Sequence, residues 1–270
     1  MAPLDVRARV ISNVRLSDDY NVLTLAAPAI GERTEPGQFV MVKAEGCTES
    51  LLRRPFSVFE IVRDEGRPVA ISILNKRAGR NTNVLYQLES GQHVVCLGPL
   101  GKPFTPTADR EAWMVAGGVG LAPFATLAES LARARIDTTL FYGARSANEL
   151  FYLSGFEKLG VTLVLATEDG TRGTRARVTG PLETALAQLS GADRVMVYAC
   201  GPEPMLAAVA RLAQKFRQPC QVSVERVMGC GLGGCYSCVI PIRHGAGAAA
   251  HFVRSCIGGP VFAGADVVWD

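Results

Sequence analysis

The sequence has no long hydrophobic run, no leader-like amino terminus and no run of basic residues. A membrane-spanning helix needs about 18 or more consecutive apolar residues, and the richest apolar windows, such as residues 195–199, have the length of a buried strand. The 28 Lys and Arg are scattered among 25 Asp and Glu, which predicts no basic surface for nucleic acid. We therefore expect a cytoplasmic protein without a membrane span.

Histidine is scarce, and its three copies are interpreted as ordinary surface or packing residues. Cysteine is more plentiful, with eight copies. A cytosolic chain of this length is not expected to use them as disulfides, because the compartment keeps thiols reduced and a large core needs no covalent staples. Cys47, Cys96 and Cys220 are isolated in the sequence and are predicted to be inert core residues.

The pattern of apolar residues changes twice along the chain. Residues 1–106 contain short β-rich runs separated by Gly and Pro, which predicts a small antiparallel β-barrel. In residues 107–220 apolar strands alternate with helical segments, which is typical of a parallel-sheet α/β nucleotide-binding domain. Residues 221–270 carry half of the cysteines and are predicted to form a small third domain.

The cysteine spacing in the third domain is the most specific motif of the chain. The pattern Cys230-x4-Cys235-x2-Cys238, followed by Cys256, is the plant-type spacing of a four-thiolate [2Fe-2S] cluster. Glycines among these cysteines allow the backbone to fold tightly around a cluster. The alternatives are a structural zinc site and simple burial, but zinc modules usually supply two Cys pairs of the CxxC kind and this segment has one. We favour the cluster.

Two glycine turns follow predicted strands of the central domain. Each turn leads from a strand into a helix, where free N–H groups favour a phosphate. One such turn alone is equally explained by packing, but two at one sheet edge suit a dinucleotide. The predicted NAD-binding residues are Gly117, Gly118, Val119, Gly120, Cys200, Gly201 and Pro202. Burial as a core residue remains an alternative for Cys200.

The barrel domain contains the segment RRPFS at residues 53–57. An arginine can hold a phosphate with two hydrogen bonds, and Ser57 can reach a flavin ring from the same strand. Taken by itself, this motif is explained better by a solvated edge strand.

In this order, the motifs resemble the ferredoxin–NADP reductase superfamily, and most closely the electron-transfer subunits of class 1B dihydroorotate dehydrogenases. The resemblance runs the whole length of the chain. Its segments are EPGQF at 35–39, LRRPFS at 52–57, LGPLG at 97–101, GGVG at 117–120, CGP at 200–202, PML at 204–206, MGCG at 228–231 and GPVF at 259–262.

The resemblance implies a flavin in the barrel, NAD(H) as substrate and single electrons leaving through the cluster. The FAD site would comprise Arg54, Pro55, Phe56, Ser57, Leu74, Asn75, Lys76, Asn81 and Thr82, and the metal ligands would be Cys230, Cys235, Cys238 and Cys256. The resemblance also implies that hydride passes between the nicotinamide and the flavin, and Ser57 and Cys200 are predicted as the catalytic residues at that point. The implied partner is a dihydroorotate-oxidising flavoprotein, in a hetero-oligomer such as a dimer of heterodimers.

The chain departs from the family pattern at three of these positions. Asn75 and Lys76 stand where the family usually has an aromatic residue and an arginine, and Asn81 stands where it has glycine. These changes leave open a reductase subunit for an oxygenase, hydrogenase or transhydrogenase assembly. A non-enzymatic redox-sensing or zinc-binding module is the third hypothesis. The positive charge of Arg145 would attract the 2′-phosphate of NADP, whereas the negative charge of Glu149 would repel it. These residues leave the choice between NAD and NADP open, and the resemblance favours NAD.

Overall fold

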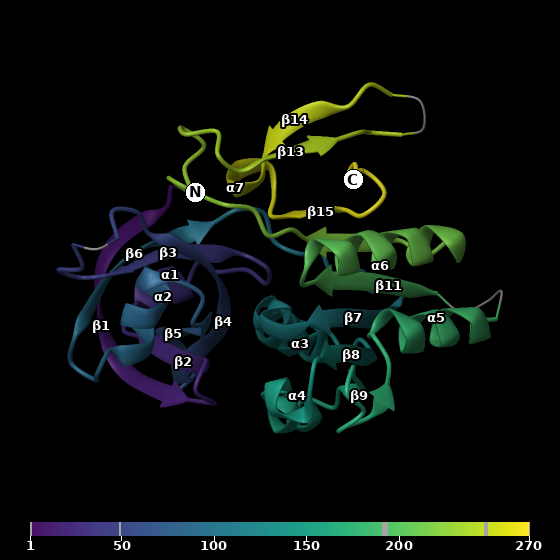
Figure 1. The fold of residues 1–270 in the computed structure, drawn as a ribbon, viewed down its shortest axis with the longest axis horizontal. Helices are drawn as coiled ribbons and strands as arrows, with labels where there is room; N and C mark the ends of the chain where they lie inside the picture. The colour runs from purple at the N-terminus through teal and green to yellow at the C-terminus, as the bar shows by residue number, and fades with distance from the viewer. Residues whose placement is uncertain (1, 49, 191–193, 246–247, 270) are drawn as a thin grey trace.

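A computed structural model describes residues 2–48, 50–190, 194–245 and 248–269. A β-barrel lies beside an open sheet covered by helices, and a smaller cysteine-bearing part lies above both (Figure 1). No helix among the described residues is long and apolar enough to cross a membrane.

Six antiparallel strands close the amino-terminal barrel in the order β1-β2-β5-β4-β3-β6, and β6 pairs back onto β1. The elements are β1 (Leu4–Arg15), β2 (Tyr20–Leu25), α1 (Pro28–Gly31), β3 (Phe39–Ala44), β4 (Arg54–Asp64), β5 (Arg67–Lys76), α2 (Arg80–Gln87) and β6 (His93–Leu100). The interior is filled by inward-facing side chains of several strands, including Val10, Leu23, Val40, Ile71 and Val94. This is the predicted antiparallel barrel.

The turn between β4 and β5 shows how the sequence closes a hairpin. Asp64 pairs with Arg67, so only Glu65 and Gly66 form the loop. Both loop residues have positive φ, 46° and 81°. That is the conformation of a two-residue turn whose twist matches the flanking strands, and glycine adopts it without strain.

A seven-stranded sheet forms the second part, in the order β10-β9-β8-β7-β11-β12-β15. Its elements are β7 (Glu111–Gly117), α3 (Ala122–Arg133), β8 (Thr138–Ala144), α4 (Leu153–Lys158), β9 (Thr162–Thr167), β10 (Thr174–Arg175), α5 (Thr179–Gln188), β11 (Val195–Cys200), α6 (Glu203–Lys215), β12 (Cys220–Ser223) and β15 (Val261–Ala263). All neighbours are parallel except β12 and β15. The predicted parallel sheet is confirmed, with one antiparallel strand at its edge.

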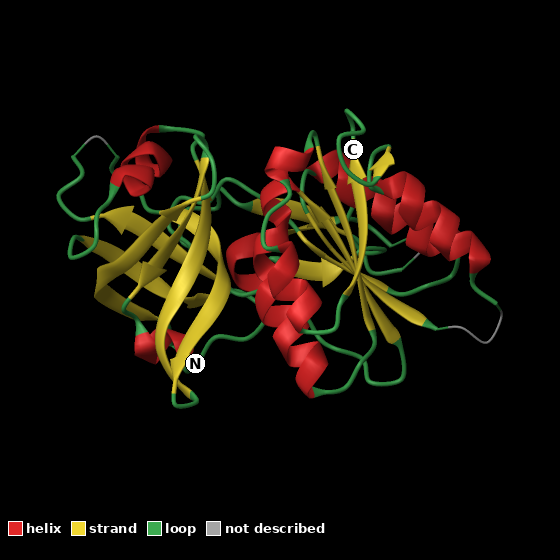
Figure 2. Ribbon diagram, turned by 90° about the horizontal axis from the view of Figure 1, so that it is seen from below, coloured by secondary structure: helices red, strands yellow, loops and turns green. Residues whose placement is uncertain are grey.

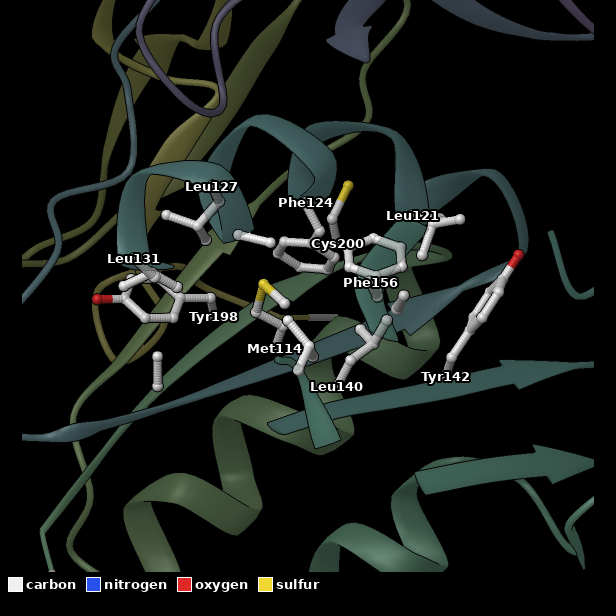
Figure 3. Packing of buried hydrophobic residues seen from close by; sticks show 14 of the residues in the cluster. Met114, Leu121, Phe124, Leu127, Leu131, Leu140, Tyr142, Phe156, Tyr198 and Cys200 are labelled. Atoms are coloured by element: carbon white, nitrogen blue, oxygen red, sulfur yellow. The ribbon is translucent and has the colours of Figure 1, made fainter. Parts of the chain in front are cut away.

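Helices cover both faces of this sheet (Figure 2). Alternate residues of β7 face opposite ways: Met114 packs with α3 and α4, whereas Trp113 and Val115 pack with α5 and α6. On α3 the side chains of Phe124, Leu127 and Leu131, spaced three and four residues apart, lie over the sheet (Figure 3). Burial on both faces explains why these strands read as continuous apolar runs.

The third part shares the sheet of the second. Its own elements are the hairpin β13 (Val239–Ile242) and β14 (His251–Arg254) and the short helix α7 (Ser255–Gly258), after which β15 joins the large sheet. Met228, Cys238 and Cys256 pack against Phe39 and Met41 of the barrel. The cysteine segment therefore contacts both larger parts.

Candidate functional site

Two cavities lie where the three parts of the chain meet. The first, the barrel cavity, has a volume of about 430 Å³ and is bounded by β4 and β5 on one side and by residues 223–228 on another. The second, the sheet-edge cavity, has a volume of about 510 Å³ and lies at the carboxyl ends of the parallel strands. In open α/β sheets, ligands bind at this edge.

Five predicted flavin residues line the barrel cavity: Pro55, Phe56, Ser57, Leu74 and Lys76. They come from β4 and β5, whose pairing in the barrel brings the two segments together.

The facing wall of the barrel cavity comes from the other two parts of the chain. It includes Ala122 at the start of α3, Cys200 at the end of β11 and Met228 just before the cysteine loop. An apolar cleft with a few polar groups at its edges is the usual form of a cofactor site.

Four other predicted flavin residues do not line this cavity. The Arg54 guanidinium is exposed and donates to the backbone oxygens of Leu52 and Arg53. The Thr82 hydroxyl caps the start of α2, accepting from the N–H of Gly79 at 2.9 Å. The structure therefore places Arg54 and Thr82 outside the cavity that the other five predicted flavin residues line.

Asn75 and Asn81 are buried inside the barrel. The Asn75 amide donates to Asn21 Oδ1 at 2.7 Å and to the backbone oxygen of Thr82 at 3.0 Å. Asn81 donates to the backbone oxygen of Val42 at 3.2 Å. Since Val42 pairs with Arg54 in the sheet, the start of α2 and Arg54 lie at one edge of the barrel. A buried network explains the asparagine at position 75.

Both glycine turns lie at the sheet-edge cavity. Gly117, Gly118, Val119 and Pro202 line it. Gly120 and Gly201 instead hold the two turns against each other: a Cβ on Gly120 would lie 2.2 Å from the Cys200 carbonyl oxygen, and one on Gly201 would lie 3.1 Å from the Gly117 nitrogen. Cys200 is buried and lines the barrel cavity rather than this one.

The far end of the sheet-edge cavity is lined by charges of both signs. Arg145 and Glu149 follow β8, as the sequence indicated, and Arg177 and Glu168 join them. The backbone N–H of Arg145 donates to the Glu149 carboxylate at 3.3 Å. Sequence reasoning did not find Arg177 or Glu168, because the loop that brings them to the sheet edge has no local signature.

Three residues line both cavities: Lys76 from the barrel, Val119 from the first glycine turn and Glu225 from the segment after β12. Sequence analysis missed Glu225. The feature that could have indicated Glu225 is its position just after β12. Because β12 runs parallel to β11, it ends at the same edge of the sheet as Cys200. Burial raises the pKa of the Glu225 carboxyl above its usual value, and the charge of Lys76 opposes that shift.

The next residue, Arg226, is held by an acidic partner. Its guanidinium donates to both carboxylate oxygens of Glu203 at the start of α6, each at 2.9 Å. This two-pronged ion pair fixes the segment that carries Glu225 against the nucleotide-binding sheet.

The four predicted metal ligands lie in a loop and a short helix above the barrel. The Cys230 N–H points at the Cys235 sulfur at 3.4 Å, and the Leu232 N–H points at the Cys230 sulfur at 3.3 Å. Hydrogen bonds from Ser237, followed by those from Cys230, lower the pKa of Cys235 to about 6. Burial, followed by the neighbouring Cys238 thiol, raises the pKa of Cys256 to about 12. Cys235 thus lies within hydrogen-bonding range of Cys230, and Cys256 lies near both Cys238 and Cys230.

Four thiols gathered in this way fit a two-iron cluster, in which each iron takes two protein ligands. Among the described residues, no three His, Cys, Asp or Glu side chains converge as they would around a single ion. Glycines shape the loop: a Cβ on Gly233 would lie 2.1 Å from Ile257, and one on Gly231 would lie 2.7 Å from Met41 of the barrel. Peptide N–H groups directed at sulfur are the contacts that stabilise a cluster.

Of the remaining cysteines, Cys96 and Cys200 are buried, and Cys47 and Cys220 are partly buried. Cys96 is buried in the barrel, and Cys47 packs against the same core. Burial raises the pKa of Cys96 and of Cys220 to about 12, so both thiols are inert at neutral pH.

A closed barrel joined to a nucleotide-type sheet, with a cysteine loop at their junction, defines an NAD-linked flavin and iron–sulfur oxidoreductase of the ferredoxin reductase fold. Family models agree with these three parts. An oxidoreductase FAD-binding domain matches residues 7–104, an oxidoreductase NAD-binding domain matches residues 114–211, and the iron–sulfur cluster binding domain of dihydroorotate dehydrogenase B matches residues 225–268.

Curated relatives narrow the class to one family. The chain is 36% identical over 266 residues to the dihydroorotate dehydrogenase B (NAD(+)) electron transfer subunit of Geobacillus kaustophilus, covering 97% of this chain and 98% of that one. The subunit of the same name from Fusobacterium nucleatum is 32% identical and is covered to 96%. This chain belongs to the family of dihydroorotate dehydrogenase B electron transfer subunits.

A solved structure of an NADH-dependent reduced ferredoxin-NADP oxidoreductase has the same architecture. It superposes with a TM-score of 0.83 at 25% identity, covering 97% of this chain and 90% of the other. The comparisons support the dihydroorotate dehydrogenase family rather than another reductase assembly or a non-enzymatic module.

Proposed function

We propose that this chain exchanges electrons between NAD(H) and a catalytic flavoprotein subunit that oxidises dihydroorotate. One observation carries the proposal: the two cavities share Lys76, Val119 and Glu225, and the cysteine loop begins directly beyond Met228 in the barrel cavity. A dinucleotide bound in the sheet-edge cavity would therefore lie next to a flavin bound in the barrel cavity. The cysteine loop would begin beside that flavin, directly beyond Met228.

The residues present fit FAD and a [2Fe-2S] cluster. Pro55, Phe56 and Leu74 offer an apolar wall for a flavin ring, and Arg54 at the edge of the barrel offers a cation for its phosphates. When bound, FAD exchanges hydride with a nicotinamide and the cluster carries single electrons. The protein supplies position, exclusion of water and control of charge.

Ser57 of the barrel strand β4 and Cys200 of the sheet strand β11 both line the barrel cavity. Burial raises the pKa of the Cys200 thiol far above neutrality, so the thiol stays uncharged beside the reacting rings. The Ser57 hydroxyl is a donor and an acceptor on the strand that forms the cavity wall. We assign both residues to holding the flavin and nicotinamide rings in register.

The surface around the cysteine loop would receive the partner. Leu232 and Tyr236 are 53% and 62% exposed, although their side chains are large and mainly apolar. Cys235 is exposed in the same loop. Apolar side chains grouped on a surface mark protein interaction sites, and electron transfer from a cluster requires the partner to come close to it.

The test is to purify the full-length chain without air and to measure its iron, sulfide and flavin. We expect two irons, two labile sulfides and one FAD per chain, and bleaching of the flavin absorbance on adding NADH. We also expect co-purification of a flavoprotein that oxidises dihydroorotate. A folded protein without flavin would contradict the proposed chemistry, and a different co-purifying oxidoreductase would contradict the proposed partner.

A further inference from the structure

Ser237 lies in the cysteine loop between two predicted cluster ligands, Cys235 and Cys238. Its hydroxyl oxygen lies 3.2 Å from the Cys235 sulfur, and the backbone N–H of Gly229 donates to the same oxygen at 2.9 Å. Glycine at 229 allows this close approach, because a Cβ there would lie 3.1 Å from the Cys235 sulfur and 3.4 Å from the Ser237 oxygen. The hydroxyl group is therefore held between an amide and a thiol.

The direction of the contact between Ser237 and Cys235 follows from the number of protons. A hydroxyl group carries one proton and two lone pairs, and the Gly229 N–H occupies one of the lone pairs. A cysteine that binds iron is a thiolate and has no proton to donate. With a cluster in place, Ser237 is therefore the donor and the Cys235 sulfur is the acceptor. A hydrogen bond to a charged acceptor is stronger than one between neutral groups.

Contacts from a neighbouring strand hold this part of the loop in place. Tyr236, between Cys235 and Ser237, has a φ of 58°, so the backbone turns sharply there. Arg254 of β14 donates to the Gly233 carbonyl oxygen at 2.8 Å, and its guanidinium group lies 4.8 Å from the centre of the Tyr236 ring. These contacts fix the position of the Ser237 hydroxyl, although the residue is exposed.

Hydrogen-bond donors face the exposed cysteine of the loop. The Cys235 sulfur lies beside the Ser237 hydroxyl and the Cys230 N–H, whereas Cys238 and Cys256 are buried in an apolar cluster with residues of the barrel. The N–H group belongs to the backbone and is present whatever side chains the loop carries. The hydroxyl depends on serine at position 237, so one substitution can remove it.

We propose that the Ser237 hydroxyl donates to the Cys235 thiolate and thereby raises the reduction potential of the cluster. This inference rests on the proposed function, because it requires a [2Fe-2S] cluster on the four cysteines. Reduction adds one electron from the flavin and no proton, so the negative charge on the sulfurs increases. A donor to sulfur then stabilises the reduced cluster more than the oxidised one. Ser237 is a positioning residue, since it acts on the irons through Cys235.

The test is a potentiometric titration of the full-length, FAD- and cluster-loaded protein without air, with dithionite as the reductant and electron paramagnetic resonance of the reduced cluster as the signal. It measures a midpoint potential and needs no turnover. In Ser237→Ala the ratio of reduced to oxidised cluster at a fixed potential should fall about 10-fold. For a one-electron couple, this is a midpoint about 59 mV more negative than that of the wild type.

Two further variants separate the hydroxyl from the shape of the side chain. Ser237→Thr keeps the hydroxyl and should titrate close to the wild type. Ser237→Val has the shape of threonine without the hydroxyl, so its midpoint should be about as negative as that of Ser237→Ala. Iron content is measured for each variant, so that potentials are compared at equal cluster occupancy.

Ser90→Ala is the matched control. Ser90 is an exposed serine of the barrel, and its hydroxyl donates to the Ile11 carbonyl oxygen at 2.9 Å. The substitution removes a hydroxyl group of the same kind away from the cysteine loop, and it should leave the midpoint potential unchanged.

Equal potentials for Ser237→Ala and the wild type, or for the threonine and valine variants, would overturn the inference and leave the proposed function intact. A folded wild-type protein without iron would instead overturn the proposed function, and the inference with it.

Discussion

At the scale of single residues, the four predicted cluster cysteines and Glu225 differ in how visible they are in the sequence. The cysteines are predicted as ligands from their spacing, and the structure places Cys235 beside Cys230 and buries Cys238 and Cys256 against the barrel. Glu225 has no motif, and only its place after β12 brings it to the cavities. Asn75, expected in the flavin site, is held within the barrel by Asn21 and Thr82.

Replacing one buried cluster cysteine should abolish the cluster. Cys238 is almost fully buried, in the same cluster as Cys256. We expect Cys238→Ser to lose most of its iron and the visible absorbance of the cluster, while FAD remains bound in the separate barrel cavity. The measurement is iron and flavin content per chain.

The control for this change is Cys47→Ser, the same substitution at a half-buried cysteine on the barrel. It should retain its full iron content. Retention of two irons by Cys238→Ser would show that this thiol is not a ligand.

At the scale of elements, the two glycine turns act as one unit. The first follows β7 and the second follows β11, and these strands are paired in parallel. The turns touch because Gly120 has no side chain. The edge of the sheet-edge cavity is formed by the close approach of two strand ends, and neither glycine motif would form it alone.

Gly120→Ala should therefore push the turns apart. Its Cβ would lie 2.2 Å from the carbonyl oxygen of Cys200, a backbone atom that cannot rotate away. We expect the Kd for NAD⁺ to rise about 10-fold or more and stability to fall by about 1–3 kcal/mol. Calorimetric binding and urea unfolding measure the two effects.

Gly180→Ala in α5 is the matched control. Its added Cβ would meet only Ala176 at 3.6 Å, an ordinary contact. Because alanine is the better helix former, this variant should be as stable as the wild type or more stable by about 0.5–1 kcal/mol, with unchanged NAD⁺ affinity. Equal effects of the two variants on NAD⁺ binding would refute the role of Gly120.

At the scale of the whole molecule, the site exists only because three parts meet. The barrel supplies Ser57 and Lys76, the central sheet supplies the glycine turns, and the cysteine-bearing part supplies Glu225. The third part is joined to the sheet through β12 and β15 and to the barrel through Met228. In this third part Leu232 and Tyr236, which lie on either side of Cys235 in the sequence, are exposed.

Negative charges placed on the surface around Cys235 should weaken partner binding without loss of cofactors. We expect the double variant Leu232→Glu and Tyr236→Glu to weaken association with the dihydroorotate-oxidising subunit by at least about 10-fold, because two buried, unpaired carboxylates would each carry a desolvation cost. Titration of the two purified subunits measures it, with iron and flavin contents as checks of folding.

Val14→Glu controls for added charge, since Val14 is 54% exposed but lies on β1 of the barrel. It should bind the partner as the wild type does. Normal association of the double variant would place the interface elsewhere.

The sequence by itself determined the features that local chemistry encodes. Short β-rich runs separated by Gly and Pro predicted the barrel, and apolar strands alternating with helical segments predicted the α/β sheet. Both are confirmed. Cysteine spacing and the order of the motifs predicted the family, which is also confirmed. The exact domain boundaries and the roles of individual site residues stay predictions.

Only the tertiary structure decided which residues share a cavity. Asn75 and Lys76 are neighbours in the sequence, but one points into the barrel network and the other lines both cavities. Glu225 lines the same two cavities as Lys76, although 148 residues separate them in the sequence, because β12 aligns beside β11 and Arg226 binds Glu203. Strand order and long-range ion pairs depend on contacts between distant segments, and no local pattern of residues records them.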